Sequence, residues 1–242
     1  MIKCKAGVIN TLVSSLEAVV DEAMWHISPD GIHVRAIDAA SAAMVYIEIP
    51  SSEFDEIGYT GDIGIFLFEL HKMMSFSKND SDVRLDLSTT GKMQMVYDEF
   101  EYTIPLIDVS LIRKNSNMPN FDLPLKVQLP TAVFETGIKA VSKTGDYILI
   151  AYDAEKELVV ISAERDSSCA KYTIDALSID EYPKSNVKSL FAADYLYPIV
   201  KNLKSVSPAT TLELGITMPA VLTSTIGENG TLTYIIAPRS ED

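Results

Sequence analysis

Residues 70–87, LHKMMSFSKNDSDVRLDL, contain an apolar stripe with helical spacing followed by an alternating, strand-like run. The same pattern returns at residues 196–214, LYPIVKNLKSVSPATTLEL. The two leading leucines are 126 residues apart (196 − 70), which is about half of the 242-residue chain. Matching elements at such an offset indicate an internal duplication. The sequence therefore predicts two topologically similar domains.

Most of the remaining chain alternates between apolar and polar residues, which is typical of half-buried antiparallel strands. Turn signals separate the runs, and the Asn229-Gly230 pair is the strongest of them. The predicted fold class is α+β, in which each domain combines antiparallel sheets with two amphipathic helices. The four expected helices cover residues 10–22, 67–77, 131–143 and 192–204.

A polar, turn-rich segment without periodicity, RKNSNMPN at residues 113–120, lies near the middle of the chain. Such composition is typical of a connector between domains. We therefore expect an N-terminal domain at residues 1–112, a connector loop at 113–121 and a C-terminal domain at 122–242.

The chain carries 34 acidic and 20 basic side chains, so its formal net charge is −14. Taken alone, this charge argues against nucleic-acid binding. Two cysteines are too few for a disulfide framework or a zinc site, which suits a reducing compartment, and both are expected to pack in strands. The N-terminus lacks the apolar core of a signal peptide, and no apolar stretch is long enough to span a membrane.

Motifs for catalysis and cofactor binding are absent from the sequence, including glycine-rich phosphate loops, HExxH and the GxSxG elbow. We therefore expect no catalytic residue, no metal and no cofactor. His26 and His33 flank one predicted hairpin, where a packed or solvated role is favoured over metal ligation. Acidic clusters at loops and strand ends leave an enzyme with carboxylate chemistry as an alternative.

Six lysines lie on or beside helix faces that point away from the predicted sheets, given a rotation of about 100° per residue. The helix at 10–22 departs from this pattern, because its outward positions carry Asn10, Ser14, Glu17 and Asp21. On their own, the lysines also fit ordinary solvated side chains. The six are Lys72, Lys78, Lys139, Lys143, Lys201 and Lys204.

Three strings resemble sliding clamps of the proliferating-cell-nuclear-antigen family: GIHVRAIDAASAAMVYIEI at 31–49, SLFAADYL at 189–196 and YIIAPR at 234–239. The similarity extends over essentially the whole chain, and the short tail is more similar to archaeal than to eukaryotic members. The resemblance implies a DNA clamp fold with two similar domains per subunit and a head-to-tail homotrimeric ring. It also implies that duplex DNA threads the ring and that the protein is a processivity factor rather than an enzyme.

The resemblance assigns non-specific phosphate contacts to the six lysines. It assigns ring closure to residues 100–107 of one subunit and 168–174 of the next. Alternatively, charge blunts both edges, or Glu101 and Lys171 pair across the seam. The implied interface residues are Phe100, Tyr102, Ile104, Cys169, Lys171 and Tyr172.

A pocket for client peptides beside the connector is also implied, in which one aliphatic and two aromatic anchors insert. Small side chains in DAASAAM, residues 38–44, leave space for such anchors, although a tightly packed loop fits this string equally well. The matching positions are Ile37, Ser41, Ala42, Met44, Met118, Pro119, Pro219, Ile235, Ala237 and Pro238.

The implied partners are double-stranded DNA, further copies of the same chain, a DNA polymerase, an ATP-driven clamp loader, a flap nuclease and a ligase. The enzymes would bind through short peptide motifs, and no membrane partner is expected. The implied location is the cytoplasm, at the nucleoid in an archaeon, or the nucleus in a eukaryote. A subunit of a heterotrimeric clamp remains an alternative.

Overall fold

The computed structural model describes residues 1–113, 118–181, 183 and 186–239 of the chain. Antiparallel sheets and four α-helices confirm the predicted α+β class. The chain forms two compact units. The first unit comprises Met1–Ile37, Val45–Asn117 and Thr225–Leu232, and the second comprises Asp38–Met44, Met118–Ser224 and Thr233–Asp242.

The main change of unit falls between residues 117 and 118, inside the predicted connector. Residues 114–117 of that connector lie outside the described residues. Two short segments, 38–44 and 225–232, belong to the unit opposite to the one that their position in the chain suggests. Nothing in the local sequence pattern predicts these two exchanges, because they depend on contacts between distant residues.

The first half of the chain supplies nine strands and two helices, besides a short 3₁₀ turn at Ser51–Glu53. They are β1 (Ile2–Lys5), α1 (Ala6–Glu17), β2 (Glu22–Ser28), β3 (Gly31–Ile37), β4 (Ala43–Pro50), β5 (Glu56–Ile57), β6 (Gly61–Phe66), α2 (Leu67–Met74), β7 (Asp82–Asp86), β8 (Lys92–Tyr97) and β9 (Phe100–Pro105).

The second half repeats this order. Its elements are β10 (Leu125–Pro130), α3 (Thr131–Val141), β11 (Tyr147–Asp153), β12 (Leu158–Arg165), β13 (Ser168–Asp175), β14 (Ser178–Glu181), β15 (Val187–Ala192), α4 (Ala193–Val206), β16 (Ala209–Leu214), β17 (Ala220–Ile226) and β18 (Gly230–Ile236). The starts of α2 and α4 are 126 residues apart (193 − 67), which confirms the predicted duplication.

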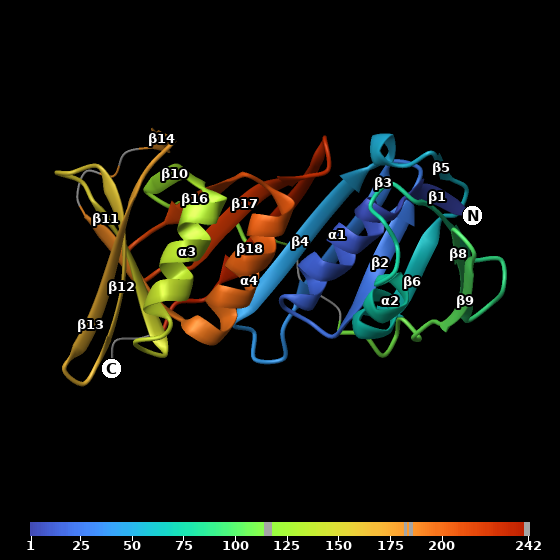
Figure 1. Cartoon of the computed structure of the whole chain (residues 1–242), viewed down its shortest axis with the longest axis horizontal. Coiled ribbons are helices and arrows are strands. Elements are labelled where there is room, and N and C mark those ends of the chain that lie inside the picture. Colours follow the sequence, from blue (N-terminus) through green and yellow to red (C-terminus); the bar gives the residue numbers. More distant parts are fainter. Residues whose placement is uncertain (114–117, 182, 184–185, 240–242) are drawn as a thin grey trace. The chain divides into compact units, whose positions relative to one another are not determined.

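Each half has two runs of hydrogen-bonded strands, and the runs correspond between the halves. The first half contains β5-β1-β7-β8-β9 and β4-β3-β2-β6, and the second contains β14-β10-β16-β17-β18 and β13-β12-β11-β15. β9 and β13 each form one edge of their sheets. The two helices of each half lie side by side (Figure 1).

The helices pack their apolar stripes into the core, as the periodicity predicts. Leu12, Val13 and Leu16 of α1 are buried, but the predicted span of this helix was wrong. α1 begins at Ala6 and ends at Glu17, so residues 18–22 of the predicted span lie outside it. The backbone N–H groups of Ala6 and Gly7 donate to carbonyls of residues 81 and 79. These long-range bonds satisfy donors at the helix start, which local sequence does not reveal.

The two cysteines occupy different environments. Cys4 in β1 is buried, and burial raises the pKa of its thiol to about 12, so its predicted packing role is confirmed. The same prediction was wrong for Cys169, which is exposed on the edge strand β13. In the described part of the chain, no helix has both the length and the apolarity needed to cross a membrane.

Candidate nucleic-acid interface and partner surfaces

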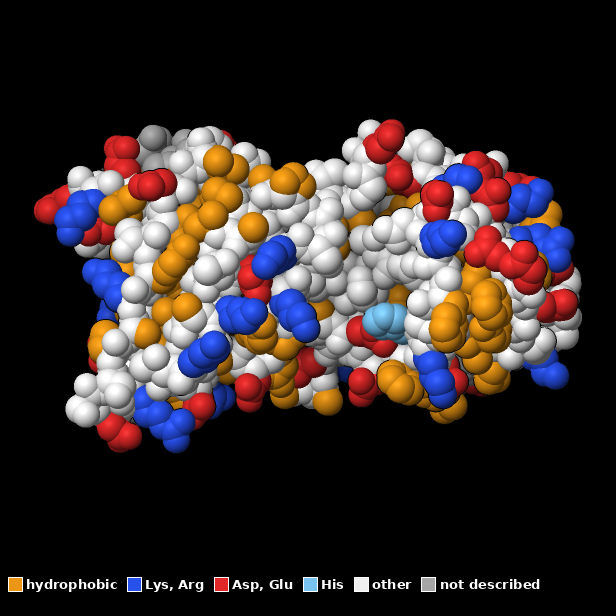
Figure 2. Space-filling model, in the orientation of Figure 1, with side chains coloured by type: hydrophobic (Ala, Val, Ile, Leu, Met, Phe, Trp, Pro, Cys, Tyr) orange, Lys and Arg blue, Asp and Glu red, His pale blue; other side chains and the backbone are white. Residues whose placement is uncertain are grey.

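The second unit presents a cationic surface on α3 and α4. The apolar stripes of both helices are buried, and Lys139, Lys143 and Lys201 are exposed. Lys143 lies two residues beyond the end of α3, since this helix ends at Val141 rather than at residue 143. Figure 2 shows basic side chains gathered over these two helices. The structure therefore brings together in one unit three of the lysines that the sequence predicted.

Lys204 of α4 belongs to the same surface but is paired. Its Nζ lies 2.8 Å from Oε2 of Glu135 in α3, and the Glu135 side chain is only 5% exposed. A carboxylate in such a position needs a partner, because an uncompensated buried charge is costly. Lys204 therefore neutralises Glu135 and links the two helices. Glu135 was not predicted, and its position on the flank of the α3 stripe was the only available signal.

Removing the ammonium group of Lys204 should destabilise the second unit. Breaking a buried ion pair costs about 3–5 kcal/mol, and we expect about 1–2 kcal/mol for Lys204→Ala because this lysine is half exposed. Urea unfolding followed by circular dichroism measures the loss. Glu135→Gln in the same chain should recover most of it, and Lys201→Ala should have little effect. An unchanged unfolding midpoint in Lys204→Ala would contradict the pairing.

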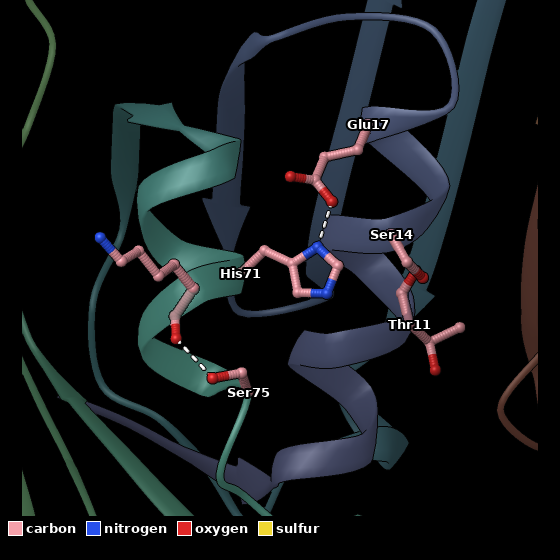
Figure 3. Close-up of polar contacts among 6 residues, drawn as sticks. Thr11, Ser14, Glu17, His71 and Ser75 are labelled. Atoms are coloured by element: carbon pink, nitrogen blue, oxygen red, sulfur yellow. Dashed lines mark hydrogen bonds and ion pairs between the residues drawn. The ribbon is translucent and has the colours of Figure 1, made fainter.

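The first unit carries fewer cations on its helix face. Lys72 is exposed on α2, and Lys78 is exposed after that helix, which ends at Met74 rather than at residue 77. Figure 3 shows His71 of α2 turned toward Glu17 of α1, with which it forms an ion pair. The hydroxyl-bearing Thr11 and Ser14 also lie on α1, at the edge of this helix that is turned away from α2 in Figure 3.

A comparison of equivalent positions in the two halves shows which lysines of the second unit have no counterpart in the first. Ser14 and Lys139 occupy equivalent positions (139 − 14 = 125), and so do Ser75 and Lys201 (201 − 75 = 126). Lys78 and Lys204 also correspond, at an offset of 126. The cationic helix surface therefore resides mainly in the second unit, in line with the acidic and polar outward positions predicted for the first helix.

The predicted contact strands are both sheet edges, as a strand-to-strand interface requires. On β9, Phe100 is 39% exposed and stacks on Phe76, itself 72% exposed, with ring centroids 6.0 Å apart. The ring of Tyr102, which follows on the same strand, also stacks on Phe100. Figure 2 shows a hydrophobic patch over β9. Phe76 was not predicted, because it lies beyond the end of α2 and only the fold brings it to β9.

Two of the predicted interface side chains are packed within their own units. Ile104 is buried at 1% exposure and faces the core below β9. Tyr172 of β13 lies against α3, where a Cβ at Gly137 would come within 2.6 Å of its ring. The alternation of the strands turns both side chains toward their own units, and their place in a subunit interface stays a prediction. Cys169 and Lys171 are exposed on β13.

Several predicted pocket residues meet in one apolar cluster of the second unit. Met44 and Met118 pack against a buried group that contains Ile235. The cluster also includes four residues that were not predicted: Leu123, Val221, Phe121 and Met218.

The other predicted pocket residues lie outside this cluster. Ala237 donates its backbone N–H to the carbonyl of Ala42 at 2.8 Å. Pro219 and Pro238 are half-buried, whereas Ser41 and Pro119 are exposed; Ile37 belongs to the first unit.

Asp38 organises the loop at residues 38–44. Its carboxylate accepts backbone hydrogen bonds from Ala40, Ala42 and Ala43, and a bond from the Tyr195 hydroxyl at 3.0 Å. Burial alone raises the pKa of Asp38, but these four hydrogen bonds outweigh burial and hold the pKa below its usual value. The loop is therefore tightly bonded. An aspartate before small residues was the available signal, since Asp side chains bond to nearby backbone N–H groups.

Comparison with known proteins identifies the family. The sequence profile of the proliferating cell nuclear antigen N-terminal domain matches residues 3–118. A DNA polymerase sliding clamp of Methanocella arvoryzae is 33% identical over 240 residues, covering 98% of this chain and 96% of that protein. The chain belongs to the proliferating cell nuclear antigen family of sliding clamps.

Other family members are similar over the same span. The sliding clamp of Methanococcoides burtonii is 31% identical over 239 residues and covers 98% of this chain and 96% of its own. A solved structure of A. fulgidus PCNA with the C-terminal region of FEN-1 bound has a TM-score of 0.89 and 27% identity over the full length of both chains. PCNA of Thermococcus kodakaraensis shares the fold at a TM-score of 0.88 and covers 99% of this clamp chain and 100% of its own.

Proposed function

We propose that this chain is a subunit of a sliding clamp that encircles duplex DNA and tethers a replicative polymerase and other DNA-processing enzymes without itself catalysing a reaction. The observation that carries the proposal is the exposed lysine cluster on α3 and α4 of an otherwise acidic clamp-family chain. A clamp with this function would act inside the cell, at the nucleoid in an archaeon.

The charge of the surface nearest to DNA, rather than the net charge of the whole particle, decides whether such a surface binds DNA. A trimer carries a formal charge of about −42 (3 × −14), which repels DNA at long range. Salt screens exposed charges beyond about 8 Å at physiological ionic strength. The nearest surface therefore dominates, and duplex DNA presents one negative charge per about 1.7 Å. Lysine contacts to phosphate carry no sequence information, which suits a protein that moves along DNA.

Retention on DNA of different topology tests this function. The clamp is assembled by a clamp loader on nicked circular plasmid and separated from free protein by gel filtration. Cutting the plasmid once should release it, because a ring leaves DNA only over an end. Binding that survives linearisation at physiological salt would contradict encirclement, and a blocked end that restores retention serves as the control.

We further propose that three copies of this chain close the ring, with β9 of one subunit beside β13 of the next. Two exposed edges and the aromatic patch at Phe76 and Phe100 support this assignment. Heterologous contacts of this type form rings when their rotation closes. The purified chain alone should then have a mass of about 80 kDa (3 × 26.6 kDa). A monomer that assembles only with a related chain would favour the heterotrimeric alternative.

Client enzymes are proposed to dock at the apolar cluster around Met44, Met118 and Ile235. The bonded loop at residues 38–44 offers a preorganised wall for a peptide with one aliphatic and two aromatic anchors, since preorganisation lowers the entropic cost of binding. A flap nuclease segment is bound in the A. fulgidus relative. A polymerase, a clamp loader and a ligase are proposed as further partners of this cluster.

Met118→Lys should weaken binding of a synthetic peptide of this type by at least about tenfold, because the ammonium group would lose water in an apolar cluster. Calorimetric titration measures the dissociation constant. Leu111→Lys is the matched control, since Leu111 is 76% exposed in the first unit. Equal affinity of the wild type and Met118→Lys would place the docking site elsewhere.

A further inference from the structure

Four polar side chains form one row across the outer face of β6, β2, β3 and β4. Asp62 pairs with His26 in the register of β6 and β2, and His26 pairs with His33 in the register of β2 and β3. Glu48 of β4 follows His33 along the row. Their neighbours Trp25, Ile27 and Ile47 point into the core, so the row faces away from it. All four belong to the first unit.

The two imidazoles are neighbours, and a carboxylate lies beside Nδ1 of each of them. Nδ1 of His26 lies 2.6 Å from Oδ1 of Asp62, and Nδ1 of His33 lies 3.7 Å from Oε1 of Glu48. The ring centroids are 6.4 Å apart with an interplanar angle of 43°. The hydrogen bond to Asp62 favours the His26 tautomer with the proton on Nδ1, which leaves the lone pair of this ring on Nε2, whereas the His33–Glu48 separation is longer than a hydrogen bond. Asp62 and Glu48 lie at opposite ends of the row, so neither carboxylate stands between the two rings.

The His26–Asp62 pair has the arrangement that metal-binding histidines use. Such histidines almost always donate their second ring N–H to a carboxylate or carbonyl, which fixes the ring and raises its basicity as a ligand. Both histidines also line a cavity of about 300 Å³ together with Met24, Arg35 and Tyr46. The cavity leaves room for water or another small ligand beside the rings.

We propose that His26 and His33 form an open two-histidine site for a divalent transition metal, with Asp62 and Glu48 as the outer partners that orient the rings. Imidazole ligands suit Cu²⁺, Ni²⁺ and Zn²⁺, and the general order of affinity places Cu²⁺ first among these. Mg²⁺ and Ca²⁺ prefer oxygen ligands and are not expected here. The proposed site has two protein ligands, since no group of three or more His, Cys, Asp or Glu side chains is placed to hold a metal within the described residues.

Arg35 shapes the open side of the site. Its guanidinium lies over the Tyr46 ring, 5.0 Å from the ring centroid, and both side chains line the cavity. A cation at this place complements an anion on the open coordination positions. The site therefore fits a metal that carries a chloride or carboxylate ligand better than a bare dication.

Metal titration of the tag-free clamp tests the proposal. The wild-type protein should bind one Cu²⁺ per chain at this site, and the EPR spectrum should contain splitting from two nitrogen ligands. His26→Asn and His33→Asn should each weaken binding by at least about tenfold and leave a one-nitrogen spectrum. Asp62→Asn should weaken Ni²⁺ and Cu²⁺ binding by about 10–100-fold, as expected for the loss of an outer partner.

The third histidine supplies a matched control. His71 is exposed and also paired with a carboxylate, Glu17, but no second imidazole lies opposite it. His71→Asn should therefore leave metal binding unchanged. Loss of binding in His71→Asn, or wild-type affinity no higher than that of His26→Asn, would overturn the proposal. Circular dichroism confirms that each variant folds, and none of these outcomes depends on whether the protein encircles DNA.

Discussion

Phe76→Asp combined with Phe100→Asp is expected to convert the proposed trimer of about 80 kDa (3 × 26.6 kDa) into 26.6 kDa monomers. The two rings stack on each other and form an exposed aromatic patch beside the edge strand β9. Full burial of a phenylalanine side chain contributes about 1.5–3 kcal/mol, so losing two at one interface weakens it by about 10²–10⁴-fold. Light scattering on the gel-filtration peak measures the mass.

Two further measurements separate lost assembly from lost folding. Both rings are substantially exposed in the single chain, so the variant should keep the wild-type circular dichroism spectrum. Cys169 on β13 should react with a thiol reagent faster in the monomer, because ring closure would cover this strand. Ile216→Ala, which changes an exposed apolar side chain outside both edge strands, should remain trimeric. A double variant that stays at the trimer mass would contradict the assigned interface.

Alanine at Lys139, Lys143 and Lys201 is expected to remove most of the direct affinity for duplex DNA. Each lysine that contacts a phosphate contributes about 1 to the slope of log K against log salt, so the slope should fall by about 3. At 50 mM salt, this corresponds to a loss on the order of 10²–10³-fold. Fluorescence anisotropy with a short duplex at several salt concentrations gives both quantities.

Two comparisons show whether position or net charge is responsible. Alanine at Lys92, Lys126 and Lys156 removes the same number of charges away from the helices and should leave the slope nearly unchanged. Alanine at Lys72 and Lys78 should have a smaller effect than the triple change in the second unit, because the first unit presents Glu17 and hydroxyl groups on its helix face. Equal losses in the two triple variants would refute a localised DNA surface.

Periodicity in the sequence was sufficient to predict the architecture. The stripes of α3 and α4 place Phe134, Ile138 and Leu196 in the core, and all three are buried. The constant offset predicted the repeat of elements from β1–β9 to β10–β18, because a duplicated chain conserves the order of its hydrophobic faces. The outward position of Lys139 follows from the same helical geometry.

The candidate sites were predicted less completely, because the sequence gives the direction of a side chain but not its neighbour. Lys204 lies on the outer side of α4 as expected, yet its ammonium group forms an ion pair with Glu135 of α3. Tyr172 lies on an edge strand as expected, yet Gly137 lets its ring rest on α3. Each outcome depends on a residue more than 30 positions away in the chain.

Whereas the expectation that β9 and β13 form sheet edges came from the family resemblance, the sequence by itself determined the α+β class, the duplication and the lysine-bearing faces. These properties follow from the alternation of apolar and polar residues, which acts locally along each helix and strand. Only the tertiary structure decided that α1 begins at Ala6, that Phe76 meets Phe100 and that His26 and His33 share a row with two carboxylates. Those features depend on hydrogen bonds, ion pairs and ring contacts between residues that become neighbours only when the chain folds.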